Sequence, residues 1–254
     1  MQSPSIEVVK KFWDNVPCNI NHSNKDLNTK EYFNEVSNKR YRVEPHILSF
    51  ADFKNYKDKK VLEVGCGIAT DGQKFAENGA IYKGIDLTPK GIEIAKNRFK
   101  LFNLPGEFEV QNIEEYISSE KYDLIYSFGV LHHTPDINRA LKNIHTMLKD
   151  GGELKIMLYA KNSWKYFRII DGLDQYEAQN NVPIANVYTK EEVLDLLKDF
   201  KNIKIEQTHI FPYKIEEYKQ QKFIKEDYFE CMPDDLFNCL KKNLGWHLCI
   251  TCYK

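Results

Sequence analysis

The hydrophobic positions of this 254-residue chain follow two alternating periods from about residue 60 to residue 160. Short apolar runs with the length of a buried strand recur there, and between them apolar residues return at the spacing of one helix face. The runs predict strands at Lys60–Val64, Ala80–Asp86, Glu107–Gln111, Tyr122–Phe128 and Glu153–Tyr159. Because strands that alternate with helices usually form a parallel sheet, this region predicts a sheet with helices on both faces.

Helix-start signals indicate where the connecting helices begin. Thr70 and Gln73 have the spacing of a capping box. Thr88-Pro89 and Thr134-Pro135 each place a capping residue before a proline, which suits the first helical position. The last of these helices is expected to continue until Gly151-Gly152.

The flanking segments complete the sheet and add elements around it. Helices are predicted at Ile6–Trp13 and Lys30–Val43, and a capping box at Thr189–Glu192 opens another. Two further strands are predicted at Lys201–Phe211 and Gly245–Tyr253. We therefore expect a doubly wound α/β fold with a mostly parallel, seven-stranded, Rossmann-like sheet and an antiparallel C-terminal strand.

One domain over residues 1–254 is the simplest organisation. It would consist of an N-terminal helical cap (1–55), a core (56–160) and two insertions, 161–188 and 212–243, that carry aromatic residues and could cover a substrate.

Composition narrows the function classes. The net charge of −1 gives no reason to expect nucleic acid or an anionic membrane as partner. No apolar run has transmembrane length and the start lacks a secretory signal, so we expect a cytoplasmic protein. Cys249 and Cys252 form a CxxC pair, but on a strand their sulfurs would point to opposite faces. We therefore expect reduced thiols and no metal site. The sequence gives no signal for an oligomeric state.

The turn after the first strand is the most informative candidate site. Gly65 and Gly67 let a ligand approach bare backbone, next to the unpaired N–H groups of a helix start. Asp86 ends the second strand, where a carboxylate can accept both hydroxyls of a ribose. An adenosine-containing ligand is therefore expected, and two kinds fit. A dinucleotide would require a third glycine where Thr70 stands, whereas Glu63 suits the ammonium group of S-adenosylmethionine.

Four segments in the same order resemble motifs of class I S-adenosylmethionine-dependent methyltransferases, especially the ubiquinone/menaquinone-type small-molecule enzymes. They span residues 58–160 and comprise Glu63–Ala69, Gly84–Pro89, Tyr122–Asp136 and Leu148–Leu154. The resemblance implies a site for S-adenosylmethionine, with S-adenosylhomocysteine as product. The implied cofactor-binding residues are Glu63, Gly65, Cys66, Gly67, Asp86, Leu87, Asn112, Ile113, Ser127 and Phe128. Asn112 stands where the family usually has an aspartate.

Methyl transfer is an in-line displacement, so the protein aligns the acceptor and removes its proton where it has one. His132 and His133 follow the fourth strand and are candidate general bases, with His133 favoured; a packing role for both is the alternative. Candidate acceptor-binding residues come from the flanking segments, and Arg42 and Arg168 are included because arginine is scarce and binds anions bidentately. The full set is Trp13, Tyr41, Arg42, Tyr159, Arg168 and Tyr188.

A small-molecule methyltransferase that acts on oxygen, nitrogen or carbon is the function we expect. The alternatives are a protein or RNA methyltransferase, a non-catalytic module that binds S-adenosylmethionine, and a nucleotide-dependent oxidoreductase.

Overall fold

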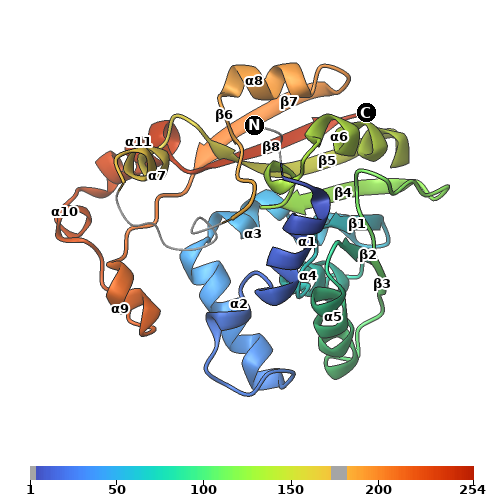
Figure 1. Ribbon diagram of the computed structural model, residues 1–254, viewed down its shortest axis with the longest axis horizontal. Coiled ribbons are helices and arrows are strands. Elements are labelled where there is room, and N and C mark those ends of the chain that lie inside the picture. The colour runs from blue at the N-terminus through green and yellow to red at the C-terminus, as the bar shows by residue number, and fades with distance from the viewer. Residues whose placement is uncertain (1–3, 173–181) are drawn as a thin grey trace.

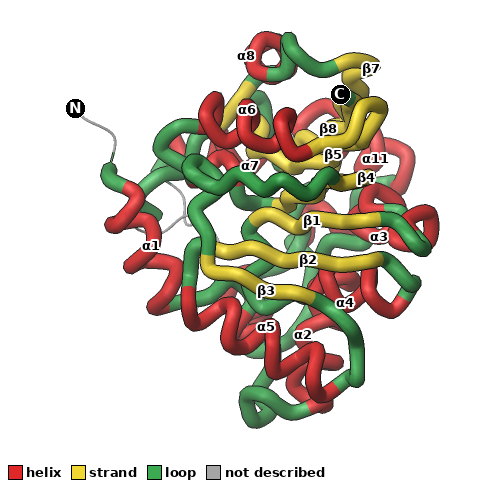
Figure 2. The backbone as a smooth tube through the Cα atoms, turned by 90° about the vertical axis from the view of Figure 1, so that its right-hand side faces the viewer, coloured by secondary structure: helices red, strands yellow, loops and turns green. Residues whose placement is uncertain are grey.

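A mixed β-sheet forms the centre of the computed structural model, which describes residues 4–172 and 182–254 (Figures 1 and 2). Within those residues the sheet has eight strands in the order β3-β2-β1-β4-β5-β8-β7, and β6 pairs with β5 beside this path. The strands are β1 (Lys60–Val64), β2 (Ile81–Asp86), β3 (Glu107–Val110), β4 (Tyr122–Phe128), β5 (Leu148–Ala160), β6 (Val187–Tyr188), β7 (Lys201–Thr208) and β8 (His247–Tyr253).

Strand directions confirm the expected fold class. The neighbours β3, β2, β1, β4 and β5 pair in parallel, and Figure 2 shows the first four side by side. The C-terminal strand β8 runs antiparallel to both β5 and β7. The two-residue β6 adds an eighth strand that the sequence pattern does not predict, because two residues are too few to show a period.

Helices cover both faces of the sheet, because successive strand residues point to opposite sides. Leu62 and Val64 of β1 pack with α6 and α8 in one buried cluster, whereas Val61 packs with α3, α4 and α5 in another. Figure 1 shows α6 and α8 on the opposite side of the sheet from α4 and α5. In the described ranges the helices are α1 (Ile6–Asn15), α2 (Lys30–Val43), α3 (His46–Ala51), α4 (Thr70–Glu77), α5 (Pro89–Leu101), α6 (Ile137–Met147), α7 (Trp164–Ile170), α8 (Lys190–Leu196), α9 (Ile215–Lys219), α10 (Asp227–Glu230) and α11 (Asp234–Leu244), with 3-10 turns η1 (Ile20–His22), η2 (Phe53–Tyr56) and η3 (Leu131–His133).

Two predicted helix starts are wrong. The N-cap of α4 is Ala69 in a left-handed conformation (φ 53°), without a side-chain cap, because the Thr70 hydroxyl is held by the Arg98 guanidinium (2.6 Å). Helix α6 begins at Ile137 after Asp136, whose carboxylate accepts from the Arg139 N–H (3.0 Å).

Other local signals are confirmed. Thr88 is the N-cap of α5 with Pro89 at its first position, and α8 begins with the predicted capping box of Thr189 and Glu192. The end of α6 differs from the prediction: the helix stops at Met147, and β5 runs through Gly151-Gly152. The early stop follows from pairing of Leu148 with Tyr122 of β4.

The segments outside the core contain more regular structure than the sequence indicates. The insertion at 212–243 contains α9, α10 and α11, and residues 173–181 of the first insertion lie outside the described residues. Cys252 and Cys249 belong to different buried clusters, as expected for opposite faces of β8. Among the described residues, no helix combines the length and apolarity needed to cross a membrane.

A buried ion pair joins α2 to α4. The Arg40 guanidinium donates from Nε to Asp71 Oδ1 (2.9 Å) and from Nη2 to Oδ2 (2.7 Å). The hydroxyls of Tyr41 and Tyr126 also donate to Asp71, each at 3.0 Å. Burial opposes charge on Asp71, but Arg40 and these hydrogen bonds outweigh it and hold the pKa of the carboxyl below its ordinary value.

A second buried arginine fastens the same helix. Arg98 of α5 donates from Nη1 to the Ile68 carbonyl (2.8 Å) and from Nη2 to the Phe33 carbonyl (3.1 Å). It also lies 4.6 Å from the centre of the Phe33 ring. Two arginines therefore attach α2 to the loop and helix that follow β1.

We expect Asp71→Asn to lower the free energy of unfolding by about 3–5 kcal/mol, because the variant leaves the Arg40 guanidinium buried without its counter-charge. Urea denaturation measures the loss. Glu216→Gln is the matched control, since it breaks the exposed Lys219–Glu216 pair and should cost less than about 1 kcal/mol. Equal small effects of both variants would contradict a structural role for the buried pair.

Candidate active site

The glycine turn lies where the strand order reverses. β1 has β2 on one side and β4 on the other, and in open parallel sheets a crevice forms at the carboxyl ends of such strands. Gly65 (φ 74°) and Gly67 (φ 51°) are both in the left-handed region that favours glycine. A Cβ at Gly65 would collide with the Val130 side chain, whereas a Cβ at Gly67 would meet no atom within 4 Å. The turn is thus tightly packed at Gly65 and open at Gly67.

Asp86 is held in place by the turn that it faces. Its Oδ2 accepts from the Gly67 N–H (2.8 Å), and its Oδ1 accepts from the Thr88 N–H (2.8 Å) and hydroxyl (2.6 Å). A carboxylate offers about four acceptor positions. The partly exposed Asp86 therefore keeps capacity for a ligand hydroxyl.

Glu63 lies behind the turn. It is 5% exposed and accepts a hydrogen bond from the Tyr82 hydroxyl (2.5 Å). Burial, followed by the negative charge of Asp71, raises the pKa of the Glu63 carboxyl to about 8. The glycine at position 72 of α4 leaves the space that this carboxyl and Tyr82 occupy.

The remaining candidate cofactor residues also lie at or just after the ends of β1 to β4. The Ser127 hydroxyl donates to the Val64 carbonyl (2.9 Å) and so connects the ends of β4 and β1. Asn112 is partly exposed, and its Oδ1 accepts from the Glu114 N–H (3.1 Å). Cys66 and Ile113 are buried, while Leu87 and Phe128 are partly exposed.

The two consecutive histidines of η3 differ in their surroundings. His132 is fully buried with its ring 3.7 Å from that of Tyr159, and burial lowers its pKa well below 6.5. His133 Nδ1 is 2.5 Å from the Ile184 carbonyl, so it donates and Nε2 carries the lone pair. In residues 4–172 and 182–254 nothing hydrogen-bonds that Nε2. Burial lowers the pKa of His133 to about 4, so the ring is neutral at pH 7.

Helix α1 connects the two sides of the crevice. Asp14 accepts from the Lys90 N–H at the start of α5 (2.9 Å), and the Trp13 ring lies 5.1 Å from that of His133. Figure 1 shows α1 beside α5. The N-terminal cap therefore reaches the histidine pair.

The candidate acceptor residues do not gather at one place. Trp13 and Tyr159 both contact the histidine pair. The Tyr41 hydroxyl is occupied by Asp71, and Arg42 lies over the Phe223 ring (3.9 Å). Tyr188 packs near α8 on the other face.

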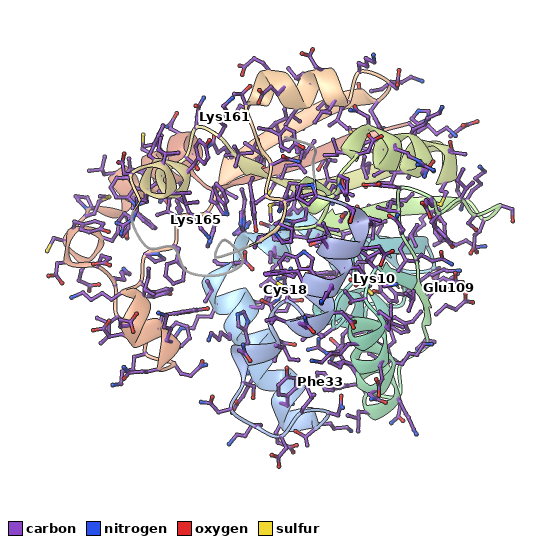
Figure 3. All side chains as sticks on the ribbon, in the orientation of Figure 1. Lys10, Cys18, Phe33, Glu109, Lys161 and Lys165 are labelled. Carbon is purple, nitrogen blue, oxygen red and sulfur yellow. The ribbon has the colours of Figure 1, made fainter. Side chains whose placement is uncertain are left out.

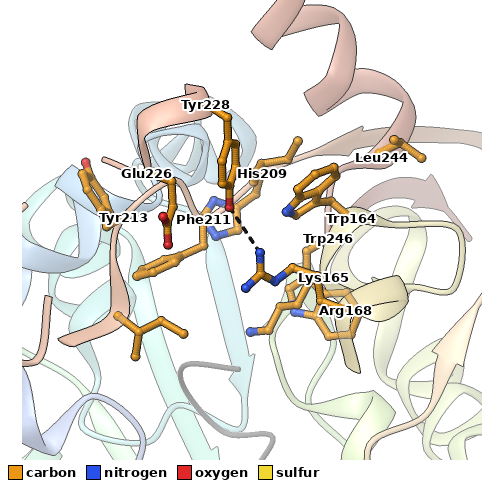
Figure 4. Close-up of a pocket in the computed structure, with 12 residues that line it drawn as sticks. Trp164, Lys165, Arg168, His209, Phe211, Tyr213, Glu226, Tyr228, Leu244 and Trp246 are labelled. Atoms are coloured by element: carbon orange, nitrogen blue, oxygen red, sulfur yellow. Dashed lines mark hydrogen bonds between the residues drawn. The ribbon is translucent and has the colours of Figure 1, made fainter. Parts of the chain in front are cut away.

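Arg168 lines a pocket between α7 and the segment that follows β7 (Figure 4). Its Nη1 donates to the Tyr228 hydroxyl (3.2 Å). Lys165, which also lines this pocket, lies on the α7 side of the molecule in Figure 3, opposite the β3 side where Glu109 lies. The lining residues include Trp164, Lys165, Arg168, His209, Phe211, Tyr228 and Trp246.

Sequence reasoning missed a second histidine cluster beside this pocket. His46 is in α3, His209 directly follows β7 and His247 is in β8, and one nitrogen of each lies within 4.8 Å of the other two. No spacing motif links positions so far apart in the chain. Only the fold brings them together.

A family model described as a methyltransferase domain matches residues 36–221. The chain belongs to this methyltransferase family. That membership confirms the resemblance of the glycine turn and the three later motifs to class I S-adenosylmethionine-dependent methyltransferases.

Curated relatives match the central part of this methyltransferase. The ubiquinone biosynthesis O-methyltransferase of Coxiella burnetii is 33% identical over 119 residues, which are 46% of this chain and 51% of that protein. The chain thus spans about half the length of the curated relatives that it matches.

Solved structures resemble the whole methyltransferase. Magnesium protoporphyrin IX methyltransferase from Synechocystis PCC 6803, with bound S-adenosylhomocysteine, is 13% identical with a TM-score of 0.63, covering 98% of this chain and 100% of that one. A possible histamine N-methyltransferase from Thermotoga maritima is 19% identical with a TM-score of 0.54, covering 88% and 97%. At these identities the likeness concerns the fold.

The raised pKa of Glu63 predicts a pH dependence of stability. The folded methyltransferase keeps this proton up to about pH 8, whereas the unfolded chain loses it near 4.5. The stability that the proton contributes is therefore present below pH 4.5 and lost as the pH rises through 8, by up to about 1.4 kcal/mol per pH unit.

We expect Glu63→Gln to flatten this fall, because the amide does not titrate. Urea denaturation at several pH values between about 5 and 8 measures the slope. Glu109→Gln is the control, since the pKa of Glu109 is lowered by Lys83 and its titration lies below this window. An unchanged slope in Glu63→Gln would show that Glu63 is already ionised throughout the window.

Proposed function

We propose that this methyltransferase transfers a methyl group from S-adenosylmethionine to an oxygen, nitrogen or carbon of a small-molecule acceptor. The observation that carries the proposal is the open glycine turn at the reversal of strand order, with Asp86 fixed by the turn's own Gly67 N–H. This arrangement supports an adenosine ligand whose ribose hydroxyls reach Asp86.

The residues around the turn fit the methyl donor. Open space in front of Gly67 leaves room for the ligand against bare backbone, and Asp86 retains acceptor capacity. We assign Leu87, Asn112 and Ile113 to the adenine side, and Ser127 with Phe128 to the methionine side. Glu63, buried behind the turn, and Cys66, buried within it, support its shape.

Glu63 favours S-adenosylmethionine over a dinucleotide as the ligand. A cationic group beside the turn would favour the ionised form of its buried carboxyl, whereas a pyrophosphate would disfavour it. Asp71, the next acidic side chain behind the turn, is neutralised by Arg40. The negative potential here thus depends on the ionisation of Glu63.

S-adenosylmethionine supplies an activated methyl group on a sulfonium. The protein's part is to align the acceptor with that methyl and to accept a proton from it. His133 is placed for the second role, because its Nδ1 donates to Ile184 and leaves the Nε2 lone pair unused. A general base works best when its pKa lies near the working pH. Burial lowers the pKa of His133 to about 4, so the ring is a weak base until a bound acceptor raises that pKa. His132, enclosed by Tyr159, has a packing role.

The buried, aromatic surroundings of His133 favour a small-molecule acceptor over protein or RNA. Trp13 of α1 and Tyr159 of β5 flank His133 with aromatic surface, and we propose that they bind the acceptor beside the ring. The named activities of similar proteins, on a quinone precursor pathway and on magnesium protoporphyrin IX, are small-molecule methylations. A cytoplasmic location and the absence of a nucleic-acid partner stay predictions.

Asp86→Asn should weaken S-adenosylmethionine binding by about tenfold or more, because it removes one charged acceptor for the ribose hydroxyls. Isothermal titration with S-adenosylmethionine and S-adenosylhomocysteine measures the loss. Glu109→Gln, which removes a carboxylate from the neighbouring strand β3, is the control and should bind as the wild type does. Stabilisation of the wild type by NAD in thermal unfolding, without stabilisation by S-adenosylmethionine, would overturn the proposal.

His133→Gln should lower the turnover number by about 10²–10⁴ when the acceptor carries a proton, while S-adenosylhomocysteine binding stays within about twofold. The measurement is S-adenosylhomocysteine release with a metabolite extract as the acceptor source. His145→Gln on α6 is the matched control. If His133→Gln retains full turnover on an acceptor that must lose a proton, His133 is not the base.

A further inference from the structure

Three imidazoles from distant parts of the chain converge next to the pocket of Figure 4. His46 Nε2 lies 3.0 Å from His247 Nδ1, and the ring of His209 is stacked on that of His247 with centres 4.5 Å apart. One nitrogen from each of the three lies within 4.8 Å of the other two. None of the three is assigned to the methyl-transfer site proposed above, but the cluster adjoins it, because the Phe128 ring lies 6.0 Å from that of His46 and 5.5 Å from that of His247.

The spacing suits ligands of one metal ion. Zinc bound by imidazole nitrogens at about 2.0–2.1 Å in a tetrahedron holds neighbouring nitrogens about 3.3 Å apart. The 3.0 Å pair needs only slight opening to reach that value. The His209 ring is stacked on that of His247 (interplanar angle 24°), so it must turn out of the stack to point a nitrogen lone pair at the same ion. A hydrogen bond between His46 and His247 would be replaced by two bonds to the ion.

Groups around the rings orient them for this purpose. Glu44 Oε1 lies 3.7 Å from His247 Nε2, on the side of the ring away from His46. A carboxylate behind a ligating histidine fixes which nitrogen faces the metal. His209 has a left-handed backbone (φ 70°), and its carbonyl accepts from the Trp246 N–H (2.7 Å), which holds it beside β8.

Positive and negative groups both surround the three rings. Arg40, Lys165 and Lys241 place positive charge near them. The charge of Arg40 is offset by Asp71 and by Glu44, which lies 3.4 Å away. Neutral imidazole is the form that binds metal, so ion uptake should strengthen as the pH rises through the range where imidazoles lose their proton.

We propose that His46, His209 and His247 bind one divalent transition-metal ion of the zinc type, with an open coordination position on the pocket side. His209 lines the pocket, and Lys165 and Arg168 add positive charge to its wall. The open position therefore faces the part of the molecule that best suits an anionic oxygen ligand. Three histidines with an open position are a donor set that zinc takes in proteins.

Metal binding to the full-length protein tests the proposal without relying on activity. The protein is stripped with a chelator, dialysed against Zn²⁺ or Co²⁺, and its metal content measured; Co²⁺ also gives visible bands whose intensity reports tetrahedral nitrogen ligation. We expect one ion per chain, a higher unfolding temperature with Zn²⁺, and at least about tenfold weaker binding in His209→Gln and His247→Gln.

Glu44→Gln provides a finer test, since it leaves all three imidazoles and should weaken binding by about 10–100-fold through the orientation of His247. His145→Gln and Cys249→Ala are the matched controls and should bind as the wild type does. Wild-type protein that takes up no ion, or His209→Gln with unchanged affinity and Co²⁺ bands, would overturn the proposal. Loss of binding in Cys249→Ala would also overturn it, because it assigns the ion to a thiol.

Discussion

The buried ion pair between Arg40 and Asp71 is the constraint on which the site depends. Asp71 is in the first turn of α4, directly after the glycine turn, and Arg40 is in the last turn of α2. Neither charge is tolerable in the interior without the other. Their pairing therefore holds α2 against the loop that follows β1. Arg98 attaches α2 to the same loop from the α5 side.

Charge pairing and burial together set the protonation states of the three carboxyl groups around the glycine turn. Behind the turn, one carboxyl (Asp71) is neutralised by Arg40 while another (Glu63) is kept protonated by burial. In front of it, Asp86 is partly exposed and anchored by backbone N–H groups. The rigid side of the site is thus built from the sheet and the two arginines. Helix α1 and the η3 histidines supply the side where an acceptor would lie.

Local patterns predicted most of the core, and they failed where a long-range partner took over. Strand β1, helix α2 and the Thr189 capping box match the prediction to the residue, because period and turn chemistry are local properties. Thr70 has the sequence of a cap, yet Arg98 binds its hydroxyl and Ala69 adopts the cap position. Arg42, a candidate acceptor ligand by its scarcity, lies over the Phe223 ring, and its role toward an acceptor stays a prediction. An arginine's partner is set by tertiary contacts that composition does not encode.

The sequence by itself determined the alternating strands and helices, the glycine turn, the position of Asp86 at the end of β2 and the methyltransferase motifs. Each of these features depends on residues that are close together in the chain. Only the tertiary structure decided that Trp13 meets His133, that Arg40 serves Asp71, and that His46, His209 and His247 share one corner of the molecule. The physical reason is that these contacts join elements remote along the chain. Their side chains meet only after the sheet has brought α3, β7 and β8 together.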